Sequence, residues 1–128
     1  MQRIQKIAFV FMLFCLTAFS NLKASNEPII VAQPTNLSLF LGGQALLKVK
    51  TVENLTVIFQ WQKSSDNANW LSIQGANQAT YTPQTQKTGK AWYRVLITTV
   101  EENARAVASQ SAEVTVRNVV QKELSVKE

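Results

Sequence analysis

The sequence contains no histidine and only one cysteine, Cys15, and both shortages limit its chemistry. Histidine is the usual general base, and histidine and cysteine are the usual zinc and copper ligands. The eight acidic residues are scattered. Glu101 and Glu102 are adjacent in an expected turn and would point apart, so they cannot flank a glycosidic bond as paired carboxylates do. No serine has an activating base. We therefore expect no enzyme, no metal and no other cofactor.

The first 24 residues have the pattern of a secretory signal peptide. Arg3 and Lys6 precede an apolar run over 7–19, and small or polar residues follow over 20–25. The run is shorter than the roughly 20 residues that cross a bilayer, so an uncleaved anchor is the weaker interpretation. Phe14 directly before Cys15 argues against lipidation. Cleavage between residues 20 and 25 predicts a secreted, periplasmic or cell-surface protein with no stable membrane insertion afterwards.

Removal of residues 1–24 changes the charge of the chain. Arg3, Lys6 and Lys23 account for three of the five net positive charges, which leaves +2. The remaining charges are scattered, so we expect no nucleic-acid partner. The roughly 100 residues that remain have the size of one sandwich domain. That domain would contain no cysteine, so packing alone must supply its stability.

Short segments with alternating apolar residues predict an all-β fold. Turn formers and prolines separate them, and no helical period precedes residue 118. We expect strands over 29–31, 36–41, 44–50, 56–62, 70–73, 79–82, 91–99 and 109–117. Residues 118–128 are charged and mixed, which predicts a flexible C-terminal tail.

Four positions in these segments carry a family resemblance. Val49, Trp61 and Val95 have the spacing of the first cysteine, the buried tryptophan and the second cysteine of an immunoglobulin sandwich, and Tyr93 lies two residues before the second position. Residues 28–117 therefore resemble a cysteine-free immunoglobulin-like (Ig-like) domain of secreted bacterial surface proteins. The resemblance implies a two-sheet Greek-key sandwich of about seven to eight strands. It also implies that Trp61 is buried and that the Tyr93 hydroxyl caps a backbone group.

The same alternation predicts which side chains face outward. If Tyr93 and Val95 point inward, their neighbours on that strand point outward, and inward packing of Leu71 and Ile73 turns Trp70 outward. The candidate binding face consists of Gln60, Gln62, Trp70, Trp92, Arg94 and Leu96. Two tryptophans would then flank the glutamine pair at about 10 Å, twice the strand spacing. This arrangement suits a protein partner or a sugar ring, and packing alone is the alternative.

These observations favour an exported, non-enzymatic Ig-like module for protein–protein interaction, adhesion or surface assembly. One alternative is a small carbohydrate-binding module that uses Trp70 and Trp92. Another is a structural spacer or a fragment of a multidomain surface protein. The fold itself does not separate these functions, because one fold hosts many of them.

Overall fold

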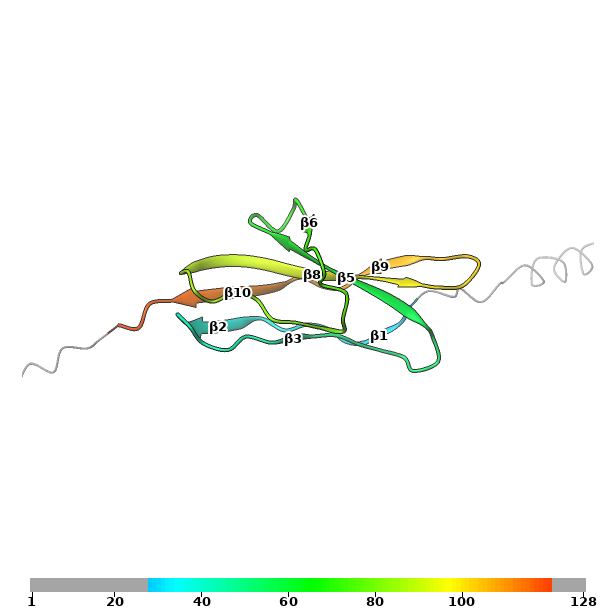
Figure 1. Ribbon diagram of the computed structural model, residues 1–128, viewed down its shortest axis with the longest axis horizontal. Coiled ribbons are helices and arrows are strands. Elements are labelled where there is room, and N and C mark those ends of the chain that lie inside the picture. The colour runs from blue at the N-terminus through cyan, green and yellow to red at the C-terminus, as the bar shows by residue number, and fades with distance from the viewer. Residues whose placement is uncertain (1–27, 121–128) are drawn as a thin grey trace, which may run out of the picture.

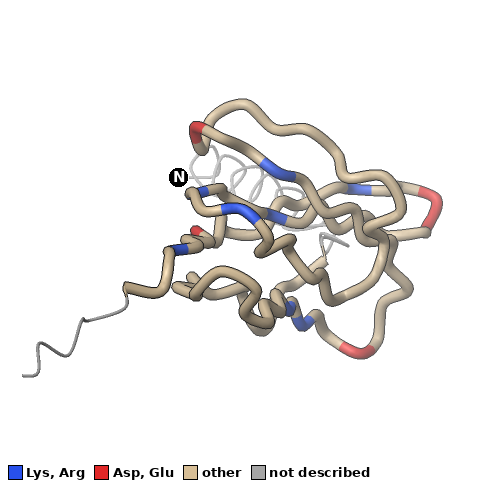
Figure 2. The backbone as a smooth tube through the Cα atoms, turned by 60° about the vertical axis from the view of Figure 1, so that its left-hand side comes forward, with Lys and Arg blue, Asp and Glu red and all other residues tan. Residues whose placement is uncertain are grey.

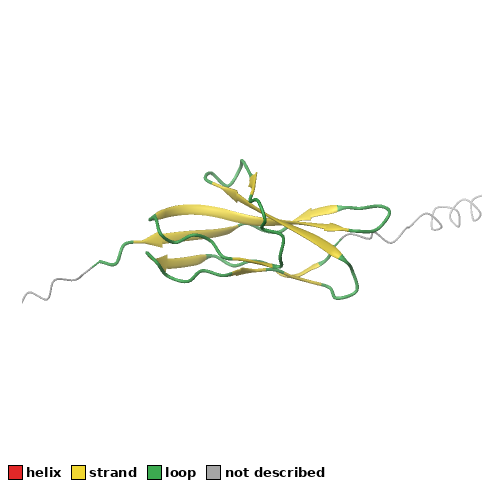
Figure 3. Cartoon of the chain, in the orientation of Figure 1, coloured by secondary structure: helices red, strands yellow, loops and turns green. Residues whose placement is uncertain are grey.

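The computed structural model describes residues 28–120, so the predicted signal peptide and the end of the predicted tail lie outside the described residues. All regular structure within that range is β-strand (Figure 3). Residues 118–120 follow the last strand without regular structure and are exposed. The all-β prediction is therefore confirmed for the described chain.

The larger layer is a six-stranded sheet built around two long strands, β5 (Val57–Ser64) and β8 (Gly89–Thr99). They pair antiparallel along the whole of β5, with Trp61 opposite Val95. The short β6 (Leu71–Ser72) borders β5. On the other side of β8 lie β9 (Ala106–Ala108) and β10 (Ala112–Arg117), and β2 (Leu37–Phe40) runs parallel to β10.

The second layer faces the inner side of this sheet (Figure 1). It comprises β1 (Ile30–Ala32) paired with β4 (Lys50–Thr51), and β3 (Leu47–Lys48) paired with β7 (Thr80–Tyr81). The backbone N–H of Val49 donates to the Ala79 carbonyl at 2.9 Å, which joins the two pairs into one layer.

The chain changes layer between β1 and β2, where Pro34 is buried. Proline has no N–H to donate to a ladder, so it suits this break. Two side chains of the segment between β1 and β2 form hydrogen bonds with the backbone near the start of β10. The Gln33 amide oxygen accepts from the Gln110 N–H at 2.9 Å, and the Asn36 amide oxygen accepts from the Glu113 N–H at 2.8 Å.

The core lies between the layers and is centred on Trp61, which is 0% exposed. Its indole N–H donates to the Gln78 carbonyl at 2.8 Å, which satisfies the one polar atom of the ring. The Tyr81 ring lies 6.0 Å from the Trp61 ring and 5.6 Å from the Tyr93 ring. The other core residues are Leu47, Val49, Val95, Ile97, Ala112, Val114 and Val116. The valines at the two expected cysteine positions thus pack in the core.

Two of the predicted strands differ in extent from those in the structure. The segment expected over 44–50 forms the separate strands β3 and β4, and the one expected over 109–117 begins only at Ala112. No strand was expected over β9, which lies between the expected turn at Glu101 and Glu102 and the strand expected over 109–117. Three residues of the last segment, 109–111, face two residues of β8, so a β-bulge divides β9 from β10.

Two side-chain predictions were wrong. Leu71 was expected inside, but it is 78% exposed, because β6 is an edge strand with a sheet neighbour on one side only. The Tyr93 hydroxyl was expected to cap a backbone group, but it makes no hydrogen bond to any residue in 28–120. It instead lies near Tyr81, and burial together with that neighbour raises the pKa of Tyr93.

Candidate functional site

The candidate residues meet on the outer face of the six-stranded sheet, the face turned away from the second layer. The register places Gln60 opposite Leu96, Gln62 opposite Arg94 and Ser64 opposite Trp92. These positions alternate with the buried Trp61, Val95 and Tyr93, as the period of a strand requires. We call Gln60, Gln62, Trp70, Trp92, Arg94 and Leu96 the outer face.

A continuous set of contacts crosses this face around Arg94. The guanidinium carbon lies 4.5 Å from the centre of the Trp70 ring, which is a cation–π contact. The Nε–H of Arg94 donates to the Gln62 amide oxygen at 2.8 Å. The Gln62 amide nitrogen in turn donates to the Ser72 hydroxyl at 3.3 Å. Arg94 is therefore held in one orientation by neighbours on both sides.

The two glutamines have structural partners, which changes the arrangement expected from the sequence. Gln62 is only 9% exposed. The Gln60 amide nitrogen donates to the carbonyls of Trp61 and Ile73, at 3.0 Å and 2.8 Å, and so ties the chain after β6 to β5. The glutamines lie on β5, between the strand of Trp92 and the segment of Trp70, but their amides are bonded within the sheet, and Arg94 is the group that contacts Trp70.

The second tryptophan lies further along the same face. Trp92 is half-buried, and Lys90 Nζ lies 5.9 Å from the centre of its ring. Lys90 also forms an ion pair with Glu113 at 3.3 Å, on the neighbouring strand β10. Leu96 is half-buried between Gln60 and Ala108 in the ladder. The outer face thus carries two aromatic residues, each with a basic partner.

The loop over 64–69 leads directly into Trp70, and one carboxylate organises it. Asp66 Oδ1 accepts from the Ser64 hydroxyl and from the backbone N–H groups of Ala68 and Asn69, at 2.8–2.9 Å. Asp66 Oδ2 accepts from the Asn69 side chain at 2.7 Å. These bonds stabilise the charged form and hold the pKa of Asp66 well below its ordinary value. Asn67 takes a left-handed conformation with φ of 59° within this turn.

Sequence reasoning missed two contributors to the site. Ser72 receives the hydrogen bond from Gln62, and Lys90 lies against Trp92. Alternation along their strands places both on the outer face, so this signal was present. The role of each residue depends on the residue opposite it on the neighbouring strand, and the sequence of one strand alone does not specify that residue.

The part of the chain that the structure describes offers no group of acidic or sulfur residues close enough to hold a metal ion. Glu53, Asp66 and the Glu101–Glu102 pair are exposed and lie at bends of the chain, as Figure 2 shows for the acidic residues. The prediction that Glu101 and Glu102 lie in a turn is confirmed. No helix in residues 28–120 is long and apolar enough to cross a membrane.

The two packed layers, with β2 parallel to β10 and a buried tryptophan on β5, define an Ig-like β-sandwich. One solved structure supports this class. The chain is similar to the tandem Ig repeats of Dlar, with a TM-score of 0.57 and 14% identity over 77% of this chain and 52% of that structure. It thus spans about half the length of that structure. A mutant complex of titin M10 and an obscurin-like 1 Ig domain gives a TM-score of 0.38 at 16% identity, over 71% of this chain and 93% of that one.

The particular family follows from the sequence. A model of the family described as "Domain of unknown function (DUF8696)" matches residues 20–118, and the chain belongs to that family. No curated protein matches the chain.

Proposed function

We propose that this protein is an exported bacterial Ig-like module that binds a protein partner through its outer face and serves adhesion or surface assembly. The contact of Arg94 with Trp70 carries the proposal. Arginine and tryptophan are the residues most enriched among those that dominate binding energy at protein interfaces. Because Gln62 already fixes the Arg94 guanidinium, association would lose little side-chain entropy at this residue.

The geometry favours a protein partner over a sugar at this face. A sugar ring needs a free aromatic face, whereas the Arg94 guanidinium covers one face of Trp70. The outer face, which spans β5 and β8 and reaches Trp70 just before β6, also suits a partner of standard interface size, about 800 Å² on each side. A carbohydrate module and a structural spacer are the competing functions that the experiment must separate.

The test combines localisation with site-specific crosslinking. The producing cells are fractionated, and a photo-reactive residue replaces Leu96, which lies two residues from Arg94 on the outer face. Crosslinking in intact cells is then compared between the parent chain and Arg94→Ala. We expect an exported protein and one discrete crosslinked protein whose yield falls about tenfold with Arg94→Ala, because a truncated anchor costs more than about 1.4 kcal/mol.

The control is Lys48→Ala, which removes an exposed lysine from β3 in the other layer. It should leave the crosslink unchanged, and thermal unfolding should show that both variants are folded. A crosslink that survives Arg94→Ala would exclude this face as the binding surface. A chain that stays inside the cell, or that forms no crosslink at all, would refute the proposed function and favour a spacer.

A further inference from the structure

A pocket of about 320 Å³ opens at one end of the sandwich, away from the outer face. Its floor comes from the inner side of β8 and β10, and its walls come from Lys63 at the end of β5 and from the loop 84–88 between β7 and β8. The register places Lys63 opposite Tyr93, on the inner side of the sheet. This lysine pocket therefore lies on the opposite side of the sheet from the outer face and shares only Lys90 with the surroundings of that face, so the inference does not depend on the proposed function.

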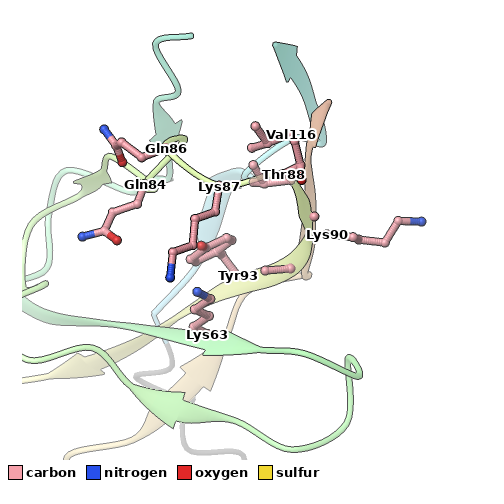
Figure 4. A pocket seen from close by; sticks show the side chains of 11 residues that line it. Lys63, Gln84, Gln86, Lys87, Thr88, Lys90, Tyr93 and Val116 are labelled. Atoms are coloured by element: carbon pink, nitrogen blue, oxygen red, sulfur yellow. The ribbon is translucent and has the colours of Figure 1, made fainter. Parts of the chain in front are cut away.

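The charge of the lysine pocket is entirely positive. Lys63, Lys87 and Lys90 line it, and no acidic residue does. Figure 4 shows Lys63 and Lys87 directed toward each other across the opening, in front of Tyr93, with Lys90 directed away. Lys90 has Glu113 as its partner. Neither Lys63 nor Lys87 forms an ion pair with any residue in 28–120.

Lys63 also lies beside an aromatic ring, since its Nζ is 6.0 Å from the centre of the Tyr93 ring. The ammonium groups of Lys63 and Lys87 face the same space and repel each other. An anion between them would be attracted to both and would offset that repulsion. The described chain offers no carboxylate in the pocket to do so. The pocket therefore has the charge and the donors for an anionic group supplied from outside.

The rest of the lining indicates what carries that anion. Val114 and Val116, on the floor, are only 3% and 6% exposed, so these two side chains offer little surface to a ligand. The amides of Gln84 and Gln86 instead offer hydrogen bonds to hydroxyl groups. Lys63 already lies against the Tyr93 ring, so recognition depends on hydrogen bonds and charge rather than on stacking.

A second pocket of about 480 Å³ adjoins the first and shares Gln86 with it. Uncharged residues line it, among them Gln44, Thr82 and the Gly42–Gly43 turn. An extended polar ligand could thus place one unit beside the lysines and the next unit in an uncharged site. We propose that this end of the sandwich binds an acidic oligosaccharide, with a sugar carboxylate between Lys63 and Lys87 and a neighbouring sugar beyond Gln86.

The experiment is isothermal titration calorimetry of the purified protein at low salt with four probes. These are an α-1,4-linked galacturonic acid hexamer, the neutral maltohexaose, a hexaglutamate peptide and sodium acetate. We expect the galacturonate hexamer to bind, the neutral sugar and acetate to bind at least about tenfold more weakly, and salt to weaken the binding. Lys63→Gln and Lys87→Gln should each lower the affinity about tenfold, because each removes a charged hydrogen-bond donor.

Lys48→Gln is the matched control, since it removes an exposed lysine from the other layer and should leave the affinity unchanged. All three variants replace exposed side chains, and their unfolding temperatures verify the fold. Hexaglutamate that binds as tightly as the sugar acid would overturn the saccharide assignment. The absence of binding by the sugar acid, or unchanged affinity in Lys63→Gln and Lys87→Gln, would overturn the site itself.

Discussion

Replacement of Ser109 by alanine tests how the last two strands are joined. At the bulge between β9 and β10, the Ser109 hydroxyl accepts a hydrogen bond from the Val95 N–H at 2.9 Å. This side chain therefore takes the place of the backbone carbonyl that a regular ladder would present. The same hydroxyl donates to the Gln110 carbonyl at 2.9 Å. Val95 is 0% exposed and Ser109 is 6% exposed, so the site is closed to bulk water.

The expected cost of Ser109→Ala follows from the group that it leaves unpaired. The buried Val95 N–H would lose its acceptor, and an unsatisfied buried donor costs about 1–3 kcal/mol. The Gln110 carbonyl belongs to an exposed residue, where water replaces the lost donor at little cost. We therefore expect the free energy of unfolding to fall by about 2 kcal/mol, which lowers the unfolding temperature of a domain of this size by about 10 °C.

Urea denaturation measures this change, and amide hydrogen exchange locates it. Protection of the Val95 N–H should decrease more than that of its neighbours in β8. The control Ser38→Ala alters an exposed serine on β2 and should change stability by less than about 0.5 kcal/mol. A loss below about 0.5 kcal/mol for Ser109→Ala, with Val95 still protected, would show that another acceptor serves this N–H and would refute the reasoning.

Three further predictions concern the core and the loop before Trp70. Trp61→Phe should lower the free energy of unfolding by about 2–4 kcal/mol, because it leaves a cavity and removes the bond to Gln78; a urea titration showing under 1 kcal/mol would contradict this. Val49→Cys with Val95→Cys should form a disulfide on oxidation and stabilise the fold by up to about 4 kcal/mol relative to the reduced form; free thiols after oxidation would contradict it. Because the folded-state pKa of Asp66 is lowered, its stabilising contribution is present above the unfolded pKa near 3.9 and is lost as pH falls through the folded value. Asp66→Asn should remove that dependence, and identical stability profiles below pH 4 for the two chains would count against it.

Much of the fold could be predicted because it depends on local alternation. Gln62 directly follows Trp61, and Arg94 lies between Tyr93 and Val95, so a period of two alone assigned each of these residues to one face of the sheet. The prediction of burial was wrong for Leu71, which lies on a strand at the edge of the sheet. Leu71 has the polarity of a core residue, but its neighbours across the ladder decide its exposure, and β6 is bordered on one side only.

The details of the candidate site depended on pairs that are distant in sequence. Gln62 and Arg94 are 32 residues apart, and only the register of β5 against β8 brings them into a hydrogen bond. The orientation of Trp70 toward Arg94 depends in addition on the Asp66 turn. A sequence pattern assigns such residues to one face of the sheet. It does not specify which side chains on that face form hydrogen bonds with one another.

The sequence by itself determined the absence of histidine chemistry, the all-β class and the inward positions of Val49, Trp61, Tyr93 and Val95. These features follow from residue type and from a period of two, which are local properties. Tertiary structure alone decided that Arg94 lies against Trp70, that Ser109 completes the ladder, and that Lys63 and Lys87 face one pocket. Each of these depends on how strands far apart in the chain align, and that alignment is set by the packing of the whole core.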